Sequence, residues 1–170
     1  MQLAALIISI VALLVSSGTG VRALRLSRQS TSTRVLIDLF SEHRSDRLAK
    51  ARNFVHTELG NYDPALGLRA LAEDDRLLVR ELAAFYDNLG VLVAYDVVDI
   101  APVSGYLGGS VLDLWPKLQP FVVTERERRT AAGNADPQRW VGYFEILHGL
   151  MLDHPPASAR QLRRRRRLPR

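Results

Sequence analysis

Two groups of side chains in this 170-residue sequence have residue types and spacings that could support metal chemistry. Glu145 and His148 lie three positions apart on a predicted helix, the spacing by which di-iron carboxylate bundles direct two side chains at one metal. Such a centre needs two Glu-x-x-His pairs, and the chain holds no second one. Glu42, His43 and Asp46 could also approach one another where two predicted helices join. We favour a chance surface pair for the first group and a capped, solvated junction for the second.

The glycine-rich segment 105–110, GYLGGS, could in principle hold a phosphate against a following helix. It lacks the lysine of a phosphate-binding loop, and no strand is predicted before it. Ser110 has no Gly-x-Ser-x-Gly context that would make it a nucleophile. The absence of cysteine excludes thiolate metal sites and cysteine catalysis. We therefore predict a helix–helix turn capped by Ser110, and no catalytic residue, cofactor or metal.

The elements that position these residues are predicted to be helical, because apolar residues between positions 30 and 153 recur at helical spacing. The pattern predicts an all-α bundle of about five helices. The first covers 31–43, and the second is capped by Ser45 or Asp46 and ends at Gly60 as a left-handed cap. The third lies over 71–92, the fourth begins at Ser110, and the last runs from Asp136-Pro137 to 153. A short additional helix, opened by Asp99 and closed by Gly108-Gly109, precedes the fourth.

The helix over 71–92 has the most regular pattern. Its first turn carries the acids 73–75, which complement the positive end of the helix dipole. Leu71, Leu78, Phe85 and Leu92 are seven residues apart, with Leu82 and Leu89 between them, which predicts a packing seam through the centre of the bundle. Later in the chain, Pro116 and Pro120 are expected to bend a helix, and Trp115 and Trp140 lie on apolar stripes typical of a core.

The net charge of +5 is unevenly distributed. Residues 1–29 contain three arginines and no acid, and residues 160–170 contain seven arginines and no acid. The remaining 13 basic and 18 acidic residues lie in 30–159, so the predicted folded domain is acidic. A nucleic-acid-binding domain needs the opposite sign to neutralise phosphates, and nucleic acid is therefore an unfavoured partner.

Residues 1–21 carry no charged side chain and include the apolar run LAALIISIVALLV. As a helix rising ~1.5 Å per residue they would reach roughly 30 Å, the thickness of a bilayer's hydrocarbon core. A cleaved signal peptide and a buried core helix are the alternatives. The first lacks basic residues ahead of the apolar run, and the second would be unusual without a polar face. The pattern favours a single transmembrane helix over 1–21.

Basic residues follow this predicted span directly, at Arg22, Arg25, Arg28 and Arg34. Such residues prefer the cytoplasmic side of a membrane, so we expect the amino terminus outside and the bundle in the cytoplasm, attached to an inner membrane. The predicted organisation is a span over 1–21, a basic juxtamembrane segment over 22–30, a bundle over 31–153 and a disordered tail over 154–170. The tail could bind anionic lipid through its basic residues, which are Arg160, Arg163, Arg164, Arg165, Arg166, Arg167 and Arg170.

Several stretches resemble a bacterial family of single-pass, all-helical membrane proteins whose domain is of unknown function. They are LIDLFSEHRSDRLAKARNFV, NYDP, ELAAFYDNLGVLVAYDVVD and GYLGGSVLDLWPKLQPFV. The resemblance covers about residues 3–130 and excludes the arginine tail. It implies a membrane-attached helical domain and no known catalytic residue.

These observations predict a non-enzymatic protein whose bundle serves as a protein-interaction or scaffold module, binding another protein or a second copy of itself. The surface around Asp63 and the acids 73–75 is the predicted contact region. The alternative is a small-molecule-sensing bundle, with a pocket of several hundred Å³ near Trp115 and Tyr106.

Overall fold

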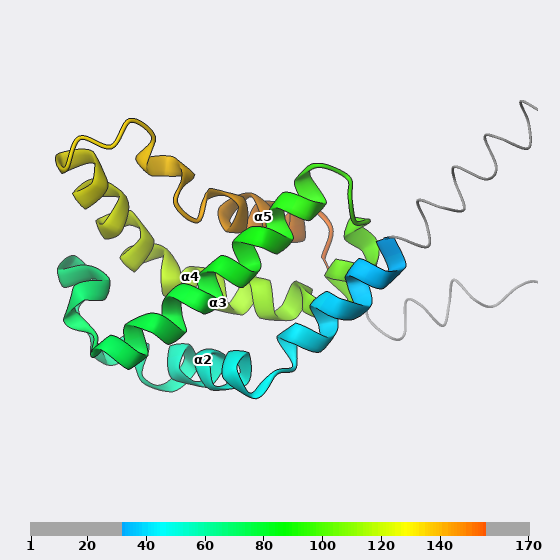
Figure 1. Ribbon diagram of the computed structural model, residues 1–170, viewed down its shortest axis with the longest axis horizontal. Coiled ribbons are helices and arrows are strands. Elements are labelled where there is room, and N and C mark those ends of the chain that lie inside the picture. Colours follow the sequence, from blue (N-terminus) through cyan, green and yellow to red (C-terminus); the bar gives the residue numbers. More distant parts are fainter. Residues whose placement is uncertain (1–31, 156–170) are drawn as a thin grey trace, which may run out of the picture. The chain divides into compact units, whose positions relative to one another are not determined.

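The computed structural model describes residues 32–155, and all regular structure in that range is helical (Figure 1). This confirms the predicted all-α class. The chain divides into two compact units, residues 1–38 and 39–170. Residues 32–43 are helical, as predicted, and residues 32–38 are the described part of the first unit. The bundle described below belongs to the second unit.

Within residues 32–155 no helix combines the length and apolar character needed to cross a bilayer. The predicted span over 1–21, the juxtamembrane arginines 22, 25 and 28 and the tail arginines lie outside the described residues. They stay predictions.

Helix α2 (Asp46–Thr57) begins as predicted, because the hydroxyl of Ser45 accepts the Leu48 N–H at 3.4 Å. Its end differs from the prediction. The chain tightens into a 3-10 turn, η1 (Leu59–Asn61), when the Asn61 N–H bonds the Glu58 carbonyl at 2.9 Å. Gly60 is therefore not a left-handed cap, and that prediction was wrong.

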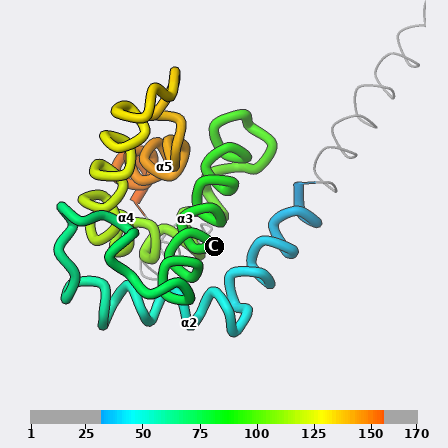
Figure 2. Tube along the Cα trace, turned by 60° about the vertical axis from the view of Figure 1, so that its left-hand side comes forward, coloured from blue at the N-terminus to red at the C-terminus, as the bar shows by residue number. Residues whose placement is uncertain are grey.

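Helix α3 (Glu73–Ala94) confirms the predicted seam. Leu82, Phe85 and Leu89 are buried, and the three acids occupy the first turn. The helix lies between α2 and α5 in both views of the fold (Figures 1 and 2) and packs against each of them. It is the central element of the bundle.

Helix α4 (Ile100–Ala131) runs without interruption for 32 residues. Its predicted cap is confirmed, since Asp99 Oδ1 accepts the Ala101 N–H at 2.9 Å. The predicted break at Gly108-Gly109 was wrong, and segment 105–110 is helix rather than a turn. A glycine costs a helix only about 1 kcal/mol, less than the burial of Val103, Leu107 and Val111 contributes on the core face of the same turns.

Helix α5 (Gly142–Asp153) begins five residues later than predicted. Asp136-Pro137 instead opens a 3-10 turn, η3 (Pro137–Arg139), and the chain then passes through Val141 in a left-handed conformation, φ 58°. Asp87 of α3 supplies the cap. Its Oδ1 accepts the N–H groups of Tyr143 at 2.8 Å and of Phe144 at 3.0 Å. The start of α5 is thus set by a residue on another helix.

Gly90 makes the close approach of α3 and α5 possible. A Cβ built on Gly90 would lie 2.2 Å from the carbonyl oxygen of Tyr143. No side chain larger than hydrogen fits there without moving the backbone of α5.

Aromatic rings fill the centre of the bundle. Phe144 stacks on Tyr86 with ring centroids 4.8 Å apart and meets Trp115 edge-on at 5.1 Å. Trp115 is 3% exposed, which confirms it as core. Tyr106 instead lies half-exposed against Phe40. The region predicted for a ligand pocket is therefore occupied by packed side chains at Trp115.

Candidate functional site

The end of α4 carries arginines that connect it to two separate segments. Arg126 donates from Nε to the Trp140 carbonyl at 3.1 Å and from Nη1 to Glu145 at 2.7 Å. Arg128 donates from Nη2 to the Leu66 carbonyl in the 3-10 segment η2 (Pro64–Ala70). These two arginines hold η2 and the segment before α5 against the same stretch of α4.

Gly67 permits the contact between Arg128 and η2. Its φ of 66° is left-handed, and a Cβ there would lie 2.7 Å from Arg128 Nη1. The glycine therefore provides both the chain reversal and the space for the guanidinium group.

Arg129, one residue further along, stacks its guanidinium group over the ring of Trp140, 5.1 Å from the centroid. Its Nε lies 3.6 Å from Glu125 Oε1, an ion pair too long for a good hydrogen bond. Trp140 is half-buried in this contact, so its prediction as a core residue was wrong. The cause is the late start of α5, which leaves Trp140 in the loop.

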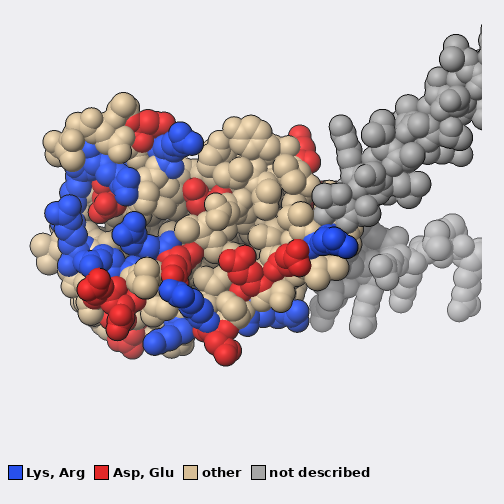
Figure 3. Space-filling model, in the orientation of Figure 1, with Lys and Arg blue, Asp and Glu red and all other residues tan. Residues whose placement is uncertain are grey.

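A cavity of about 270 Å³ lies beside this stack, and we call it the arginine pocket. Its side chains come from η2, from one face of α3, from α4 and from the loop before α5. They are Leu68, Arg69, Arg76, Arg80, Glu125, Arg129 and Trp140. Four arginines and one glutamate thus line this cavity. Basic side chains gather where the end of α4, η2 and the start of α3 meet (Figure 3).

Of the four arginines that line the arginine pocket, only Arg129 forms an ion pair with a carboxylate within residues 32–155, that of Glu125. Arg69, Arg76 and Arg80 form no ion pair with a carboxylate of the described chain. Buried nitrogens of Arg126, Arg128 and Arg129 have no hydrogen-bond partner there either. Arg69 and Arg80 are exposed and Arg76 is half-buried, so the pocket presents guanidinium donors that an anion with oxygen acceptors can reach.

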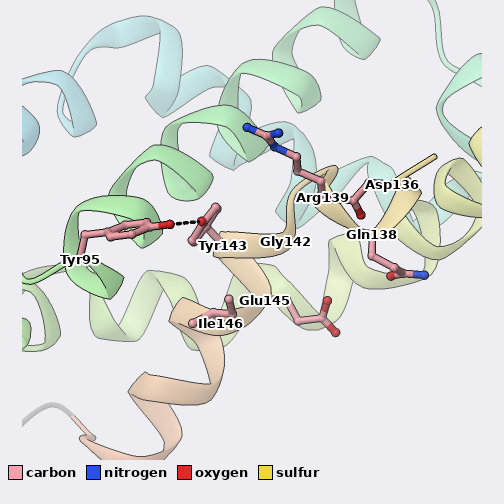
Figure 4. A pocket seen from close by; sticks show the side chains of 8 residues that line it. All are labelled: Tyr95, Asp136, Gln138, Arg139, Gly142, Tyr143, Glu145 and Ile146. Carbon is pink, nitrogen blue, oxygen red and sulfur yellow. Dashed lines mark hydrogen bonds between the residues drawn. The ribbon is translucent and has the colours of Figure 1, made fainter. Parts of the chain in front are cut away.

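A second, more open cavity of about 630 Å³ adjoins the start of α5, and we call it the tyrosine pocket (Figure 4). The hydroxyls of Tyr95 and Tyr143 meet at 3.1 Å on one side of it. The rest of its lining is mostly polar, with one large apolar side chain, and consists of Asp136, Gln138, Arg139, Gly142, Glu145 and Ile146. In the close-up Arg139 and Glu145 extend away from one another, so these charged groups do not converge on one point.

The tyrosine pair is suited to hydrogen bonding rather than to proton abstraction. The hydrogen bond with Tyr95, followed by burial, raises the pKa of Tyr143 above its ordinary value. The Tyr143 hydroxyl therefore keeps its proton at neutral pH.

His43 is buried rather than solvated at its helix junction, contrary to the prediction. Its Nε2 lies 3.1 Å from the hydroxyl of Tyr86, and Arg52 donates to its backbone carbonyl at 2.6 Å. Burial, and then the charge of Arg52, lowers the pKa of His43 to about 4. Burial also raises the pKa of Tyr86 to about 12. Both groups are neutral at pH 7 and form a buried hydrogen-bonded pair in the core.

The His43 pair predicts a loss of stability in mild acid. An unfolded histidine binds a proton near pH 6.5, whereas folded His43 does so only near pH 4. The stability that this difference provides is complete above about pH 6.5 and is lost as the pH falls toward about 4. Between about pH 6.5 and 4, the melting temperature of the natural chain should fall more steeply with decreasing pH than that of His43→Gln. The exposed His56→Gln should keep the steep decline, and equal slopes for all three would contradict this role.

The other residues singled out in the sequence have structural partners. Glu145 pairs with Arg126, and the ring of His148 lies 6.3 Å from that of Trp115. The described residues contain no group of three or more potential metal ligands. Asp63 caps η2 by accepting the Ala65 N–H at 2.9 Å. Arg34 is an exposed residue of the first unit.

The sequence interpretation missed the arginine pocket. One signal was present, since Arg76 and Arg80 are four residues apart and so share a face of α3. A second was the ERERR run over 125–129. Neither signal indicates that the two stretches meet, which depends on how η2 folds back over α4.

A protein-family model described as a domain of unknown function (DUF4760) matches residues 1–136. No curated protein and no solved structure matches the chain. The family match leaves α5 and Trp140 outside it.

Proposed function

The chain belongs to the DUF4760 family, a domain of unknown function, and from this premise we propose that it is a membrane-attached helical binding module. Its bundle binds an anionic partner through the arginine pocket. Under this proposal the arginine pocket is the site of contact.

One observation supports the proposal most directly. Arg69, Arg76 and Arg80 line the same cavity, and within the described chain each lacks a carboxylate partner. Arg126 and Arg128, in contrast, each donate to a backbone carbonyl of another segment. The acidic residues predicted as a contact region are a weaker candidate, because Asp63 caps η2 and Glu73–Asp75 complement the dipole of α3.

Membrane attachment is supported by the sequence alone. The uncharged residues 1–21 and the arginines that follow them favour an inner-membrane anchor with the bundle in the cytoplasm. In this arrangement the arginine tail lies on the same side as the bundle and can contact anionic lipid.

A reporter fused after Arg170 tests this topology. A reporter that is active only in the cytoplasm should be active, and one that is active only in the periplasm should be silent. The opposite pattern, or recovery of the full-length fusion in the soluble fraction, would refute the anchor or its orientation.

Anion binding is tested by thermal stabilisation of the full chain in detergent, at constant ionic strength, by phosphate, sulfate, succinate and a short glutamate peptide. At least one of these should raise the melting temperature, because a ligand of the folded state stabilises it by mass action. The variant Arg76→Gln/Arg80→Gln should lose the effect while melting within a few degrees of the natural chain.

The matched control is Arg44→Gln/Lys50→Gln, which removes the same charge from two exposed residues that line neither pocket. It should retain the stabilisation. If no anion stabilises the chain, or if both double variants respond alike, the proposed function is wrong.

The tyrosine pocket supports the alternative expected from the sequence, a small-molecule-sensing bundle, at a different place from the one predicted. Its volume of about 630 Å³ is within the range of small-molecule sites. Binding of an uncharged compound that Tyr143→Ala abolishes and Arg76→Gln/Arg80→Gln leaves intact would favour this alternative.

A further inference from the structure

We propose that the ligand group of the arginine pocket is a phosphate monoester, carried by a small soluble molecule or by a lipid headgroup. This inference rests on the proposed function, since it requires that the pocket bind an anion. It goes further by distinguishing a terminal phosphate from a carboxylate and from a phosphodiester.

The directions from which the arginines approach favour a phosphate. Arg69 comes from η2, Arg76 and Arg80 come from one face of α3, and Arg129 comes from α4. A carboxylate has two oxygens in one plane and is satisfied by a single guanidinium fork. A phosphate monoester presents three terminal oxygens in a tetrahedral arrangement, so donors from three segments can each reach one.

The charge of the arginine pocket also favours a doubly charged group. Four arginines and one glutamate line the pocket, which leaves three positive charges in excess. A phosphate monoester carries about −1.5 to −2 charges at pH 7. A diester carries one charge and offers two unesterified oxygens, so it leaves more of the guanidinium nitrogens without an acceptor.

The size of the arginine pocket limits what enters it. Its volume of about 270 Å³ is slightly below the range of about 300–1,000 Å³ that is usual for small-molecule sites. This accommodates a phosphate group and a few atoms of the molecule that carries it. The remainder of a larger ligand must stay outside.

The experiment uses the full chain in nanodiscs of neutral lipid, with methyl phosphate, dimethyl phosphate, succinate and sulfate as probes. Binding is followed by calorimetry and by the emission of Trp140, whose ring contacts Arg129 of the pocket. Trp140→Phe should abolish the emission change while the calorimetric signal persists, which verifies the origin of the optical signal.

Methyl phosphate should bind at least about tenfold more tightly than dimethyl phosphate or succinate, because the additional charge-assisted hydrogen bonds are each worth about that factor. The variant Arg76→Gln/Arg80→Gln should bind methyl phosphate about tenfold or more weakly, and Arg44→Gln/Lys50→Gln should bind it as the natural chain does. The affinity for methyl phosphate should also fall as the pH drops through about 6, where the phosphate binds its second proton. The affinity for sulfate should fall less over the same pH range.

A second arm distinguishes the two sources of the phosphate. Nanodiscs containing phosphatidic acid, a monoester, are compared with nanodiscs containing phosphatidylglycerol, a diester. Competition with methyl phosphate by phosphatidic acid alone supports a lipid source, and the absence of competition by either lipid supports a soluble one.

Equal or tighter binding of succinate, sulfate or dimethyl phosphate would overturn the monoester assignment and leave the proposed function standing. Equal competition by the two lipids would overturn it as well. Binding of none of the probes, together with no stabilisation by any anion, would refute both.

Discussion

Replacing Gly90 with alanine is expected to lower the free energy of unfolding by about 3 kcal/mol or more, and the melting temperature by about 10 °C. The added methyl group would lie 2.2 Å from the Tyr143 carbonyl oxygen and 2.6 Å from its carbon. These are backbone atoms, so a side-chain rotation cannot relieve the overlap. Helix α5 must move away, which also lengthens the two hydrogen bonds that its first turn makes to Asp87. Thermal and urea denaturation of the full chain measure the change.

Gly105→Ala is the matched control, because Gly105 also lies inside a helix and a Cβ there meets nothing within 4 Å. Alanine is favoured over glycine in a helix by about 1 kcal/mol, so this variant should be as stable as the natural chain or slightly more so. Similar destabilisation by both substitutions would show that the contact between α3 and α5 is looser than the structure describes.

Ending the chain after Asp136, where the family match ends, is expected to abolish cooperative unfolding. The truncation removes Phe144, Leu147 and Met151, each 0% exposed. Burial of one such side chain stabilises a fold by about 1.5–3 kcal/mol, so three together approach the total stability of a typical domain, about 5–15 kcal/mol. Circular dichroism and calorimetry should show residual helix without a sharp transition.

A chain ending after residue 159 is the control, because it removes the arginine tail and retains α5. It should unfold cooperatively near the temperature of the full chain. If the chain ending at Asp136 melted in the same way, α5 would be an accessory to the domain rather than part of its core.

The features predicted correctly from the sequence depend on neighbouring residues. Ser45 and Asp99 cap the helices that follow them, and the seven-residue spacing in α3 identifies its buried face. Each of these interactions is made within one or two helical turns. The class of the fold and most of the core follow from such local patterns.

The features predicted wrongly depend on contacts between distant segments. Asp136-Pro137 is a strong local signal for a helix start, yet α5 starts at Gly142, where Asp87 of another helix accepts its free N–H groups. Gly108-Gly109 resembles a break, yet burial keeps α4 continuous.

The arginine pocket was unpredictable from the sequence for the same reason. Arg69, Arg76 and Arg129 come from three segments, and each alone is typical of a solvated surface residue. Only the folding of η2 against α4, fixed by Arg128 and Gly67, brings them to one cavity.

The cap that Asp87 provides for α5 also affects the order in which the domain assembles during translation. Asp87 and Tyr143 are 56 residues apart in the chain. At a synthesis rate of about 5–20 residues per second, α3 is complete several seconds before the residues that it caps. A 12-residue helix is marginal by itself in water, so α5 gains stability only when α3 is there to receive it. Until then Leu89 and the surface around Gly90 stay uncovered on the nascent chain, and this interval is when the protein is most exposed to chaperones and to aggregation.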